Sequence, residues 1–328
     1  MKTAVVILNW NTRQYLQQFL PGLVRSIEGM DAEVVVADNA STDGSLDLVR
    51  ERFPQVRCIS LDRNYGFTGG YNRALEQIDA QYYVLINSDI EVSRDWLGPL
   101  EQWMDSHPQC GACGPKLLSY YQRDRFEYAG AAGGLMDRWG YTYCRGRIMS
   151  RTARDTGQYD TPASVMWVTG ACLMVRSSLW KGLGGLDDRF FAHMEEIDFC
   201  WRLQLQGYKV QVVPQSVVYH LGGGTLPQNS PWKLKLNYRN NLLMLDNNLA
   251  LTIGGRRAGA VIRWRLFLDC CSRFVYRIKG RKDYVNAVNE AHAEFRSMRR
   301  PADGRSGHCH IDGMSGRIIF IEFLKRNI

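Results

Sequence analysis

The sequence lacks several patterns that would assign it to other classes of protein. It contains no uninterrupted run of about 18 apolar residues, so a transmembrane helix is not predicted. The nine cysteines are an odd number without regular spacing, and no second pair accompanies Cys110 and Cys113 to complete a zinc site. No signal-peptide pattern precedes the apolar segment that begins at Thr3. Together these absences predict a reducing, cytoplasmic location.

The glycine-rich signatures of two common nucleotide sites are also missing. The first apolar segment runs into "NWNTRQYL", without the glycine spacing that lets a dinucleotide approach a helix, which disfavours a Rossmann dehydrogenase. The later stretch "RNYGFTGG" matches neither that signature nor a P-loop. A sugar nucleotidyltransferase stays an alternative, although no basic glycine-rich segment follows the first predicted strand.

The composition indicates a folded protein with an anionic partner. Of the 328 residues 45% are apolar, enough for a sizeable core, and the net charge is +8. Such a charge suits nucleic acid, a membrane surface or a phosphorylated small molecule, and does not choose among them.

Short β-branched runs alternate with amphipathic stretches over the first hundred residues. Predicted strands are "AVVILN", "EVVVAD", "VRCISL" and "YYVLIN", and predicted helices lie near residues 13–27, 45–52 and 70–78. This alternation predicts an α/β fold with a mostly parallel sheet and crossover helices.

The rest of the chain divides by composition. Residues 126–162 are rich in Gly, Arg and Tyr without a sustained period, which predicts long loops over the site rather than core. We expect a catalytic domain over 1–228, a basic helical region over 229–300 and a tail over 301–328. From Trp232 to Lys282 there are twelve Lys and Arg against two Asp, so the helices could pack on the main domain or bind an anionic membrane.

Polar residues follow the predicted strands at their carboxyl ends, where open α/β sheets bind ligands. Asn9 and Trp10 follow the first strand, Asp38 and Asn39 end the second, and Asn64 follows the third. Asp38 is suited to accept hydrogen bonds from a nucleobase or ribose, although the residues after it could simply cap the next helix. The glycine-rich turn that leads to Gly70 could present backbone N–H groups to an anion.

Three titratable residues are candidates for chemistry. Asp89 follows the fourth strand and could begin a Mg²⁺ or Mn²⁺ site, or it could be a turn residue. Glu196 lies near the start of a helix predicted from about Glu195 to Gln206, where the dipole favours the ionised form that a general base needs. His220 follows a strand and could complete a metal site.

Seven segments, taken in order, resemble the family 2 glycosyltransferases, especially their bacterial rhamnosyltransferase-like branch. They are "VVILNWN", "VVVADNASTDGS", "RNYGFTGGYN", "VLINSDIEV", "WVTGACLMVR", "FFAHMEEIDFCWRL" and "YHLGGGT". Their order and spacing agree over about Thr3 to Asn248. The resemblance implies the type A nucleotide-sugar-binding fold of that family.

The resemblance also implies roles for individual residues. Glu196 would be the base, and Asp89 with His220 would bind a divalent cation, Mg²⁺ or Mn²⁺. The family usually has Glu-Asp where this chain has Glu195 and Glu196, and Asn87 replaces the first aspartate of the metal motif. The expected nucleotide- and donor-binding residues are Asn9, Trp10, Asp38, Asn39, Asn64, Gly70, Asn72, Asn87, Ser88, Gly170, Ala171 and Arg239. For Arg239 a salt bridge within the helical region is an equal alternative.

The implied activity is a single inverting displacement. A sugar, with rhamnose as one candidate, would move from a dTDP- or UDP-linked donor to a hydroxyl of a saccharide or lipid-linked acceptor in cell-surface polysaccharide synthesis. The enzyme would act in the cytoplasm, with peripheral contact to the inner face of the cytoplasmic membrane and no nucleic acid partner. A non-catalytic nucleotide-sugar-binding scaffold is an alternative from another class.

Overall fold

The computed structural model describes residues 1–222, 230–300 and 306–324. The strands are β1 (Thr3–Asn9), β2 (Ala32–Asp38), β3 (Arg57–Ser60), β4 (Tyr82–Ile86), β5 (Ile90–Val92), β6 (Cys110–Ser119), β7 (Gly134–Met136), β8 (Thr142–Cys144), β9 (Arg147–Ile148), β10 (Arg151–Thr152), β11 (Ala163–Ser164), β12 (Cys172–Arg176) and β13 (Lys209–His220). The helices are α1 (Arg13–Ser26), α2 (Ser45–Arg52), α3 (Gly66–Leu75), α4 (Leu97–Ser106), α5 (Ser177–Gly182), the 3₁₀ turn η1 (Asp188–Phe190), α6 (Glu195–Leu205), α7 (Pro231–Ile253), α8 (Gly255–Ile278), α9 (Lys282–Met298) and α10 (Ile319–Leu324).

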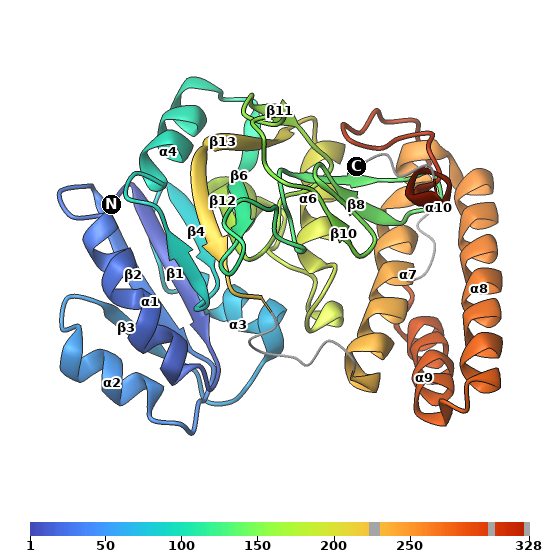
Figure 1. The fold of residues 1–328 in the computed structure, drawn as a ribbon, viewed down its shortest axis with the longest axis horizontal. Helices are drawn as coiled ribbons and strands as arrows, with labels where there is room; N and C mark the ends of the chain where they lie inside the picture. The colour runs from blue at the N-terminus through green and yellow to red at the C-terminus, as the bar shows by residue number, and fades with distance from the viewer. Residues whose placement is uncertain (223–229, 301–305, 325–328) are drawn as a thin grey trace.

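A mixed, mostly parallel sheet forms the centre of the molecule, as the sequence predicts (Figure 1). Its strand order is β11-β13-β6-β12-β4-β1-β2-β3, and β5 pairs with β13. β1 runs parallel to β2 and β4, and β6 runs parallel to β13, whereas β12 is antiparallel to both of its neighbours. The inner strands read as continuous apolar runs because both faces are covered, and Val5, Val6 and Ile7 are all buried.

Helices cover the two faces of this sheet with separate apolar cores. One core includes Leu16 and Leu20 of α1 and Leu100 of α4, while the other includes Tyr71 of α3 and Trp201 of α6. Cys110 and Cys113 are buried in the first of these cores, in keeping with a structural role. The layers therefore leave the strand ends as the open part of the sheet.

The expectation of loops rather than core over residues 126–162 is wrong. Four short strands there form a second antiparallel sheet in the order β10-β9-β8-β7, and Phe126 and Met136 are buried in the main core. Glycines interrupt the periodic spacing of apolar residues in this segment. At some of these glycines an aromatic ring occupies the space that a side chain would need. A Cβ on Gly134 would lie 2.0 Å from Cε2 of Trp167, so the missing period reflects close packing, not exposure.

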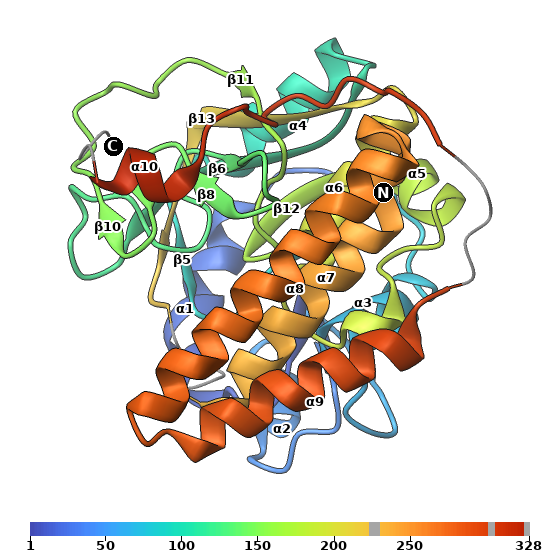
Figure 2. The same ribbon diagram turned by 90° about the vertical axis from the view of Figure 1, so that its right-hand side faces the viewer.

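The basic region is helical, as predicted, and stands to the right in Figure 1. α7 shares the core of α6 through the buried residues Leu242 and Leu245, so the alternative of packing on the main domain holds for this helix. α8 lies outermost in both views (Figures 1 and 2). The proposed boundary after residue 228 lies outside the described residues, as do Gly223 to Thr225 of the "YHLGGGT" segment. The proposed boundary after residue 300 coincides with the end of a described range. Among the described helices, none combines the length and apolar character needed to cross a bilayer.

The contact between Gly134 and Trp167 predicts a specific loss of stability. We expect Gly134→Ala to lower the free energy of unfolding by about 2 kcal/mol, because the added methyl group overpacks a fixed ring. Trp167 is only 4% exposed and its Nε1 donates to the Leu135 carbonyl at 3.2 Å, so the ring has little room to move. Denaturant unfolding measures the change.

A matched control comes from Gly182 of α5, where an added Cβ would meet nothing within 4 Å. Gly182→Ala should change the free energy of unfolding by less than about 1 kcal/mol. Equal stabilities of the two variants would contradict the packing explanation of the 126–162 segment.

Candidate active site at the strand ends

The strand ends place the first predicted residues side by side. Asn9 and Asp38 are paired in register at the carboxyl ends of β1 and β2. Nδ2 of Asn9 donates to Oδ1 of Asp38 at 2.7 Å, and the Ser41 backbone N–H donates to Oδ2 of Asp38 at 3.0 Å. Both carboxylate oxygens are thus held by the protein, while Trp10 remains 39% exposed at the rim. The strand ends therefore bring these two candidate residues together at one edge of the sheet, which we call the rim.

The helix-cap alternative holds only for Asp43. Its Oδ1 accepts the Ser45 backbone N–H at 3.0 Å where α2 begins. Ser41 instead accepts Asn9 Nδ2 at 2.9 Å, so it belongs to the rim.

A second polar cluster links the end of β2 to the turn that opens α3. Nδ2 of Asn39 donates to Oδ1 of Asn64 and to the Gly66 carbonyl, both at 3.0 Å, and the Tyr65 N–H donates back to Asn39 Oδ1 at 3.0 Å. A Cβ on Gly70 would lie 2.7 Å from Cδ2 of Leu8. Asn39, Asn64 and Gly70 therefore shape this rim through bonds and contacts within the protein.

Asn72 lies further along α3 and faces away from that cluster. Its Nδ2 donates to the Leu186 carbonyl and to Asp188 Oδ1, both at 2.8 Å, and its Oδ1 accepts the Leu186 N–H. The side chain therefore ties α3 to the loop before α6. The structure does not bring Asn72 into the cluster of Asn9 and Asp38.

Asp89 and His220 meet between β4 and the end of β13. Oδ1 of Asp89 lies 3.3 Å from Nε2 of His220, and both side chains are buried. The pairing of β5 with β13 sets this approach, because His220 is in register with Ile90. Two residues that are 131 positions apart in the sequence are therefore neighbours, as predicted.

Glu127 completes this cluster, and the sequence did not single it out. Its Oε1 lies 3.4 Å from Nδ1 of His220, so the imidazole stands between two buried carboxylates. Burial lowers the pKa of His220, but the ion pairs with Asp89 and Glu127 outweigh this and raise that pKa to about 10. Burial raises the pKa of Asp89, and the interaction with His220 brings it below its usual value. No sequence signal marks Glu127, which lies in the segment read as loops.

The donor set suits a divalent cation bound between Asp89 and His220 once the proton has left Nε2 of His220, because only a neutral imidazole binds a metal. Two adjacent ligands of one octahedral ion lie about 3 Å apart, close to the observed 3.3 Å. A carboxylate on the far nitrogen is the usual partner of a metal-binding histidine, which is the position of Glu127. In the part of the chain that the structure describes, no three His, Cys, Asp or Glu side chains converge as a complete metal site. Further ligands would have to come from a bound molecule or water.

Glu196 lies in the first turn of α6, as predicted, and its residue is half-buried, although Oε2 of its carboxylate is buried. A Cβ on Gly170 would lie 3.6 Å from Cβ of Glu196, and the neighbouring Ala171 carbonyl accepts the Asn87 N–H at 3.0 Å. This chain of contacts brings Glu196, Gly170, Ala171 and Asn87 to one side of the rim. Ser88, next to Asn87, is buried.

The environment of Glu196 favours proton transfer near neutral pH. Burial raises its pKa to about 6, opposed by backbone N–H groups of the first helical turn and of Gly170. Burial and the charge of Glu196 raise the pKa of Glu195 well above its usual range. Oε2 of each glutamate is buried without a hydrogen-bond partner among the described residues. An unpartnered buried acceptor is rare in a structural role.

A strained turn delivers the chain to α6. Three residues of this turn have positive φ values, which residues other than glycine seldom adopt: 63° at Phe191, 72° at His193 and 72° at Met194. Nδ2 of Asn240 donates to the carbonyls of Phe190, Ala192 and His193 at 2.7 to 2.9 Å. Such strain persists where the surroundings enforce it, commonly at functional sites.

Arg239 supports the same turn and does not face the rim. Its guanidinium donates to Oε2 of Glu294 at 2.7 Å and to the Phe190 carbonyl at 2.8 Å, and the side chain is 5% exposed. The structure therefore favours the internal salt bridge over a contact with a ligand. The sequence could not make this choice because Glu294 lies on another helix.

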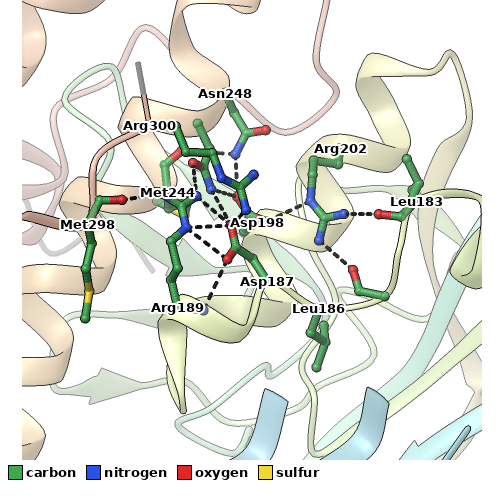
Figure 3. Close-up of polar contacts among 12 residues, drawn as sticks. Leu183, Leu186, Asp187, Arg189, Asp198, Arg202, Met244, Asn248, Met298 and Arg300 are labelled. Atoms are coloured by element: carbon green, nitrogen blue, oxygen red, sulfur yellow. Dashed lines mark hydrogen bonds and ion pairs between the residues drawn. The ribbon is translucent and has the colours of Figure 1, made fainter. Parts of the chain in front are cut away.

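A buried network anchors α6 to α7 below the turn (Figure 3). Asp198 is fully buried and accepts from Arg202 at 2.8 Å and from Asn248 at 2.7 Å. The Arg202 guanidinium also donates to the carbonyls of Leu183 and Gly185, while Arg189 binds Asp187. Asp198 and Arg202 are four residues apart on α6 and form an ion pair, which contributes to holding Glu196 in place.

Structural comparison shows which fold this is. The chain superimposes on a *S. aureus* TarS fragment (residues 1–349) in complex with UDP-GlcNAc, with a TM-score of 0.57 and 16% identity over 90% of this chain and 82% of that one. It also resembles a mannosyltransferase from *Pyrobaculum calidifontis* in complex with GDP-Man and Mn²⁺, with a TM-score of 0.56 and 14% identity over 92% and 76% of the two chains. GalNAc-T7 with UDP, GalNAc and Mn²⁺ has a TM-score of 0.56 and 18% identity over 74% of this chain, which spans about half of that protein (48%). The fold is the type A fold of glycosyltransferases.

Sequence comparison identifies the family. An N-acetylglucosaminyl-diphospho-decaprenol L-rhamnosyltransferase of *Mycobacterium tuberculosis* is 26% identical over 280 residues, which are 80% of this chain and 88% of that protein. Residues 4–182, more than half of the chain, match the model of glycosyl transferase family 2. The protein is therefore a glycosyltransferase and belongs to family 2.

Proposed function

We propose that the protein transfers a sugar, with rhamnose as the first candidate, from a dTDP- or UDP-linked donor to an acceptor hydroxyl, with inversion. The acceptor would be a saccharide or lipid-linked saccharide in cell-surface polysaccharide synthesis. The name of the mycobacterial relative, which joins rhamnose to a decaprenol-linked sugar, supports the choice of donor and acceptor. One observation carries the proposed chemistry: Glu196, which lies beside Gly170, has a carboxylate oxygen with no hydrogen-bond partner in the described part of the chain.

Glu196 would act as the general base. An acceptor hydroxyl bound near Gly170 would donate its hydrogen bond to the free oxygen of Glu196, and the proton would pass to the carboxylate as the hydroxyl attacks the anomeric carbon. A pKa of about 6 leaves the group ionised at neutral pH and still basic enough to accept that proton. The strained turn and the bonds of Asn240 would hold the carboxylate in position before the acceptor binds.

Asp89 and His220 would hold a divalent cation, Mg²⁺ or Mn²⁺, with Glu127 fixing the orientation of the imidazole. When bound, such an ion neutralises charge on the diphosphate leaving group. Asp38, Asn9 and Trp10 would bind the base and ribose of the donor, since they lie at the adjacent strand ends. Attack and departure would then occur from opposite sides of the sugar, as inversion requires.

The enzyme would work in the cytoplasm at the inner face of the cytoplasmic membrane. A lipid-linked acceptor would be presented there, and the basic helical region suits an anionic surface.

Glu196→Gln tests the base directly. The variant should bind donor as the wild type does, while kcat for transfer falls by about 100-fold or more, because the amide cannot accept the proton. Steady-state assays and calorimetric donor binding measure the two effects. Glu91→Gln is the matched control, since Glu91 lies on the nearby β5 and pairs with Arg123 at the surface. Undiminished transfer by Glu196→Gln would refute the assignment, and release of pyrophosphate by the wild type would indicate a nucleotidyltransferase instead.

The raised pKa of Glu196 sets a pH dependence. The protonated acid cannot act as a base, so kcat/KM should be low below pH 6 and rise through an apparent pKa of about 6. Donor affinity, measured by calorimetry over the same range without a divalent cation, should not change through that pKa. A rate profile flat from pH 5 to pH 7 would contradict the role proposed for Glu196.

Removing the proposed cation ligands should impair metal-dependent donor binding, an effect distinct from the loss of proton transfer expected for Glu196→Gln. Asp89→Ala and His220→Ala should each abolish the gain in donor affinity on adding Mn²⁺, and Glu127→Gln should weaken Mn²⁺ binding by about 10-fold to 100-fold. Mn²⁺ titration followed by electron paramagnetic resonance reports the ion itself. Asp95→Ala, which removes an exposed acid just beyond β5, is the control. Wild-type Mn²⁺ binding by Asp89→Ala would place the ion elsewhere.

A further inference from the structure

The outward side of α8 carries an apolar stripe along most of its length. Five exposed side chains follow one another at spacings of three and four residues: Trp264, Phe267, Cys271, Phe274 and Ile278. Phe274 is 64% exposed and Ile278 is 70% exposed. This spacing puts the five on one face of the helix, over roughly 20 Å.

The rest of the helix shows that this exposure is a property of one face. α8 packs through its opposite side on α7 and α9, and its buried residues are Ala258, Arg265 and Asp269. Figure 2 looks onto α8, with α7 behind it. An ordinary surface helix buries its apolar face and exposes its charged face. In α8 the apolar stripe faces solvent, and Arg and Asp are buried on the inner face, so the arrangement is reversed.

The stripe continues onto α10. Trp264 lies 5.7 Å from Trp139, and Tyr141, two residues further on, contacts the ring of Phe320 at 5.3 Å. Phe320, Ile321 and Leu324 of α10 are exposed, and α10 lies on the same side of the molecule as α8 (Figure 2). We call Trp264, Phe267, Cys271, Phe274, Ile278, Phe320, Ile321 and Leu324 the docking face.

Positive charge flanks the α8 part of the docking face. Arg256, Arg257, Arg263 and Arg277 are exposed on α8, and Lys279, Arg281 and Lys282 follow its end. The single acid within α8, Asp269, is buried and binds His292 at 3.1 Å. The rim that α8 contributes is therefore entirely cationic.

This charge decides between two occupants of the docking face. A second copy of the chain, paired through the stripe as in a coiled coil, would bring two sets of arginines together without the opposite charges that flank such seams. An anionic bilayer satisfies both features, because aromatic side chains enter the boundary between headgroups and acyl chains while arginines bind lipid phosphates.

We infer that the docking face binds the protein to an anionic lipid surface, with α8 lying in the plane of the membrane. This inference assigns residues to the membrane contact in the proposed function. It rests on the proposed function only for the lipid-linked nature of the acceptor. Binding to lipid and transfer of sugar are carried by different residues, so each can fail alone.

Co-sedimentation of the full chain with vesicles tests this inference. The wild type should bind phosphatidylglycerol vesicles and should bind phosphatidylcholine vesicles at least tenfold more weakly. Arg263→Gln with Arg277→Gln should lower the partition coefficient roughly 25-fold, since each Lys or Arg near an anionic surface contributes about fivefold. The matched control, Arg50→Gln with Arg52→Gln, removes the same charge from exposed positions of the distant α2 and should have little effect. Phe267→Ser with Phe274→Ser should lower binding at least tenfold, and circular dichroism checks that the variants fold.

Three results would overturn the inference. They are equal binding to both lipids, equal losses in the two arginine pairs, and a dimer by light scattering that Phe267→Ser with Phe274→Ser converts to monomer. The last result would assign the face to a second copy. Transfer to a water-soluble acceptor should be unchanged in the phenylalanine variant. Binding to vesicles without any transfer by the wild type would refute the proposed function and leave the docking face supported.

Discussion

The buried carboxylate of Asp198 constrains how the molecule is assembled. An ionised group without exposure must be compensated by hydrogen bonds, and here the partners come from two regions, Arg202 on α6 itself and Asn247 and Asn248 on α7. Removing the C-terminal helices would leave this carboxylate with Arg202 but without the two bonds to its Oδ1 from Asn247 and Asn248. The helix that carries Glu196 is therefore built jointly by the sheet domain and the helical region, and the two form one structural unit at this point.

The same dependence extends to the turn before α6. Its left-handed residues are unfavourable in isolation, and carbonyls next to them in the turn accept hydrogen bonds from α7: that of Ala192 from Asn240 and that of Phe190 from Arg239. On the other side, the Phe191 carbonyl accepts the N–H groups of Phe67 and Thr68 at the start of α3. The turn is thus held between the helical region and the start of α3. The conformation of the chain around the candidate base Glu196 therefore depends on elements that are far apart in the sequence, namely α3 and α7.

The two halves of the candidate site are built on different principles. At the ends of β1 and β2, polar side chains are satisfied by one another, as in the bond between Asn9 and Asp38, so the rim is rigid before any ligand arrives. At Glu196 an oxygen is left without a partner, and at His220 two carboxylates surround one imidazole. The first arrangement is suited to recognition by a preformed surface, and the second leaves capacity for a proton and a cation.

Local patterns in the sequence were sufficient for the elements and for part of the site. Apolar runs alternating with amphipathic stretches predicted β1 to β4 and their helices. A strand buried on both faces is a continuous apolar run, whereas a helix buried on one face has apolar residues at every third or fourth position. Resemblance over seven segments identified the family and singled out Asp89, Glu196 and His220 as candidate site residues. Only the tertiary structure decided that residues 126–162 pack as core, that Glu127 faces His220, that Arg239 binds Glu294, and that the outer side of α8 lies open. Each of these features depends on which distant residue fills the neighbouring space. One amino-acid sequence shows the periodicity along the backbone, but it does not show contacts between residues that are far apart in the chain.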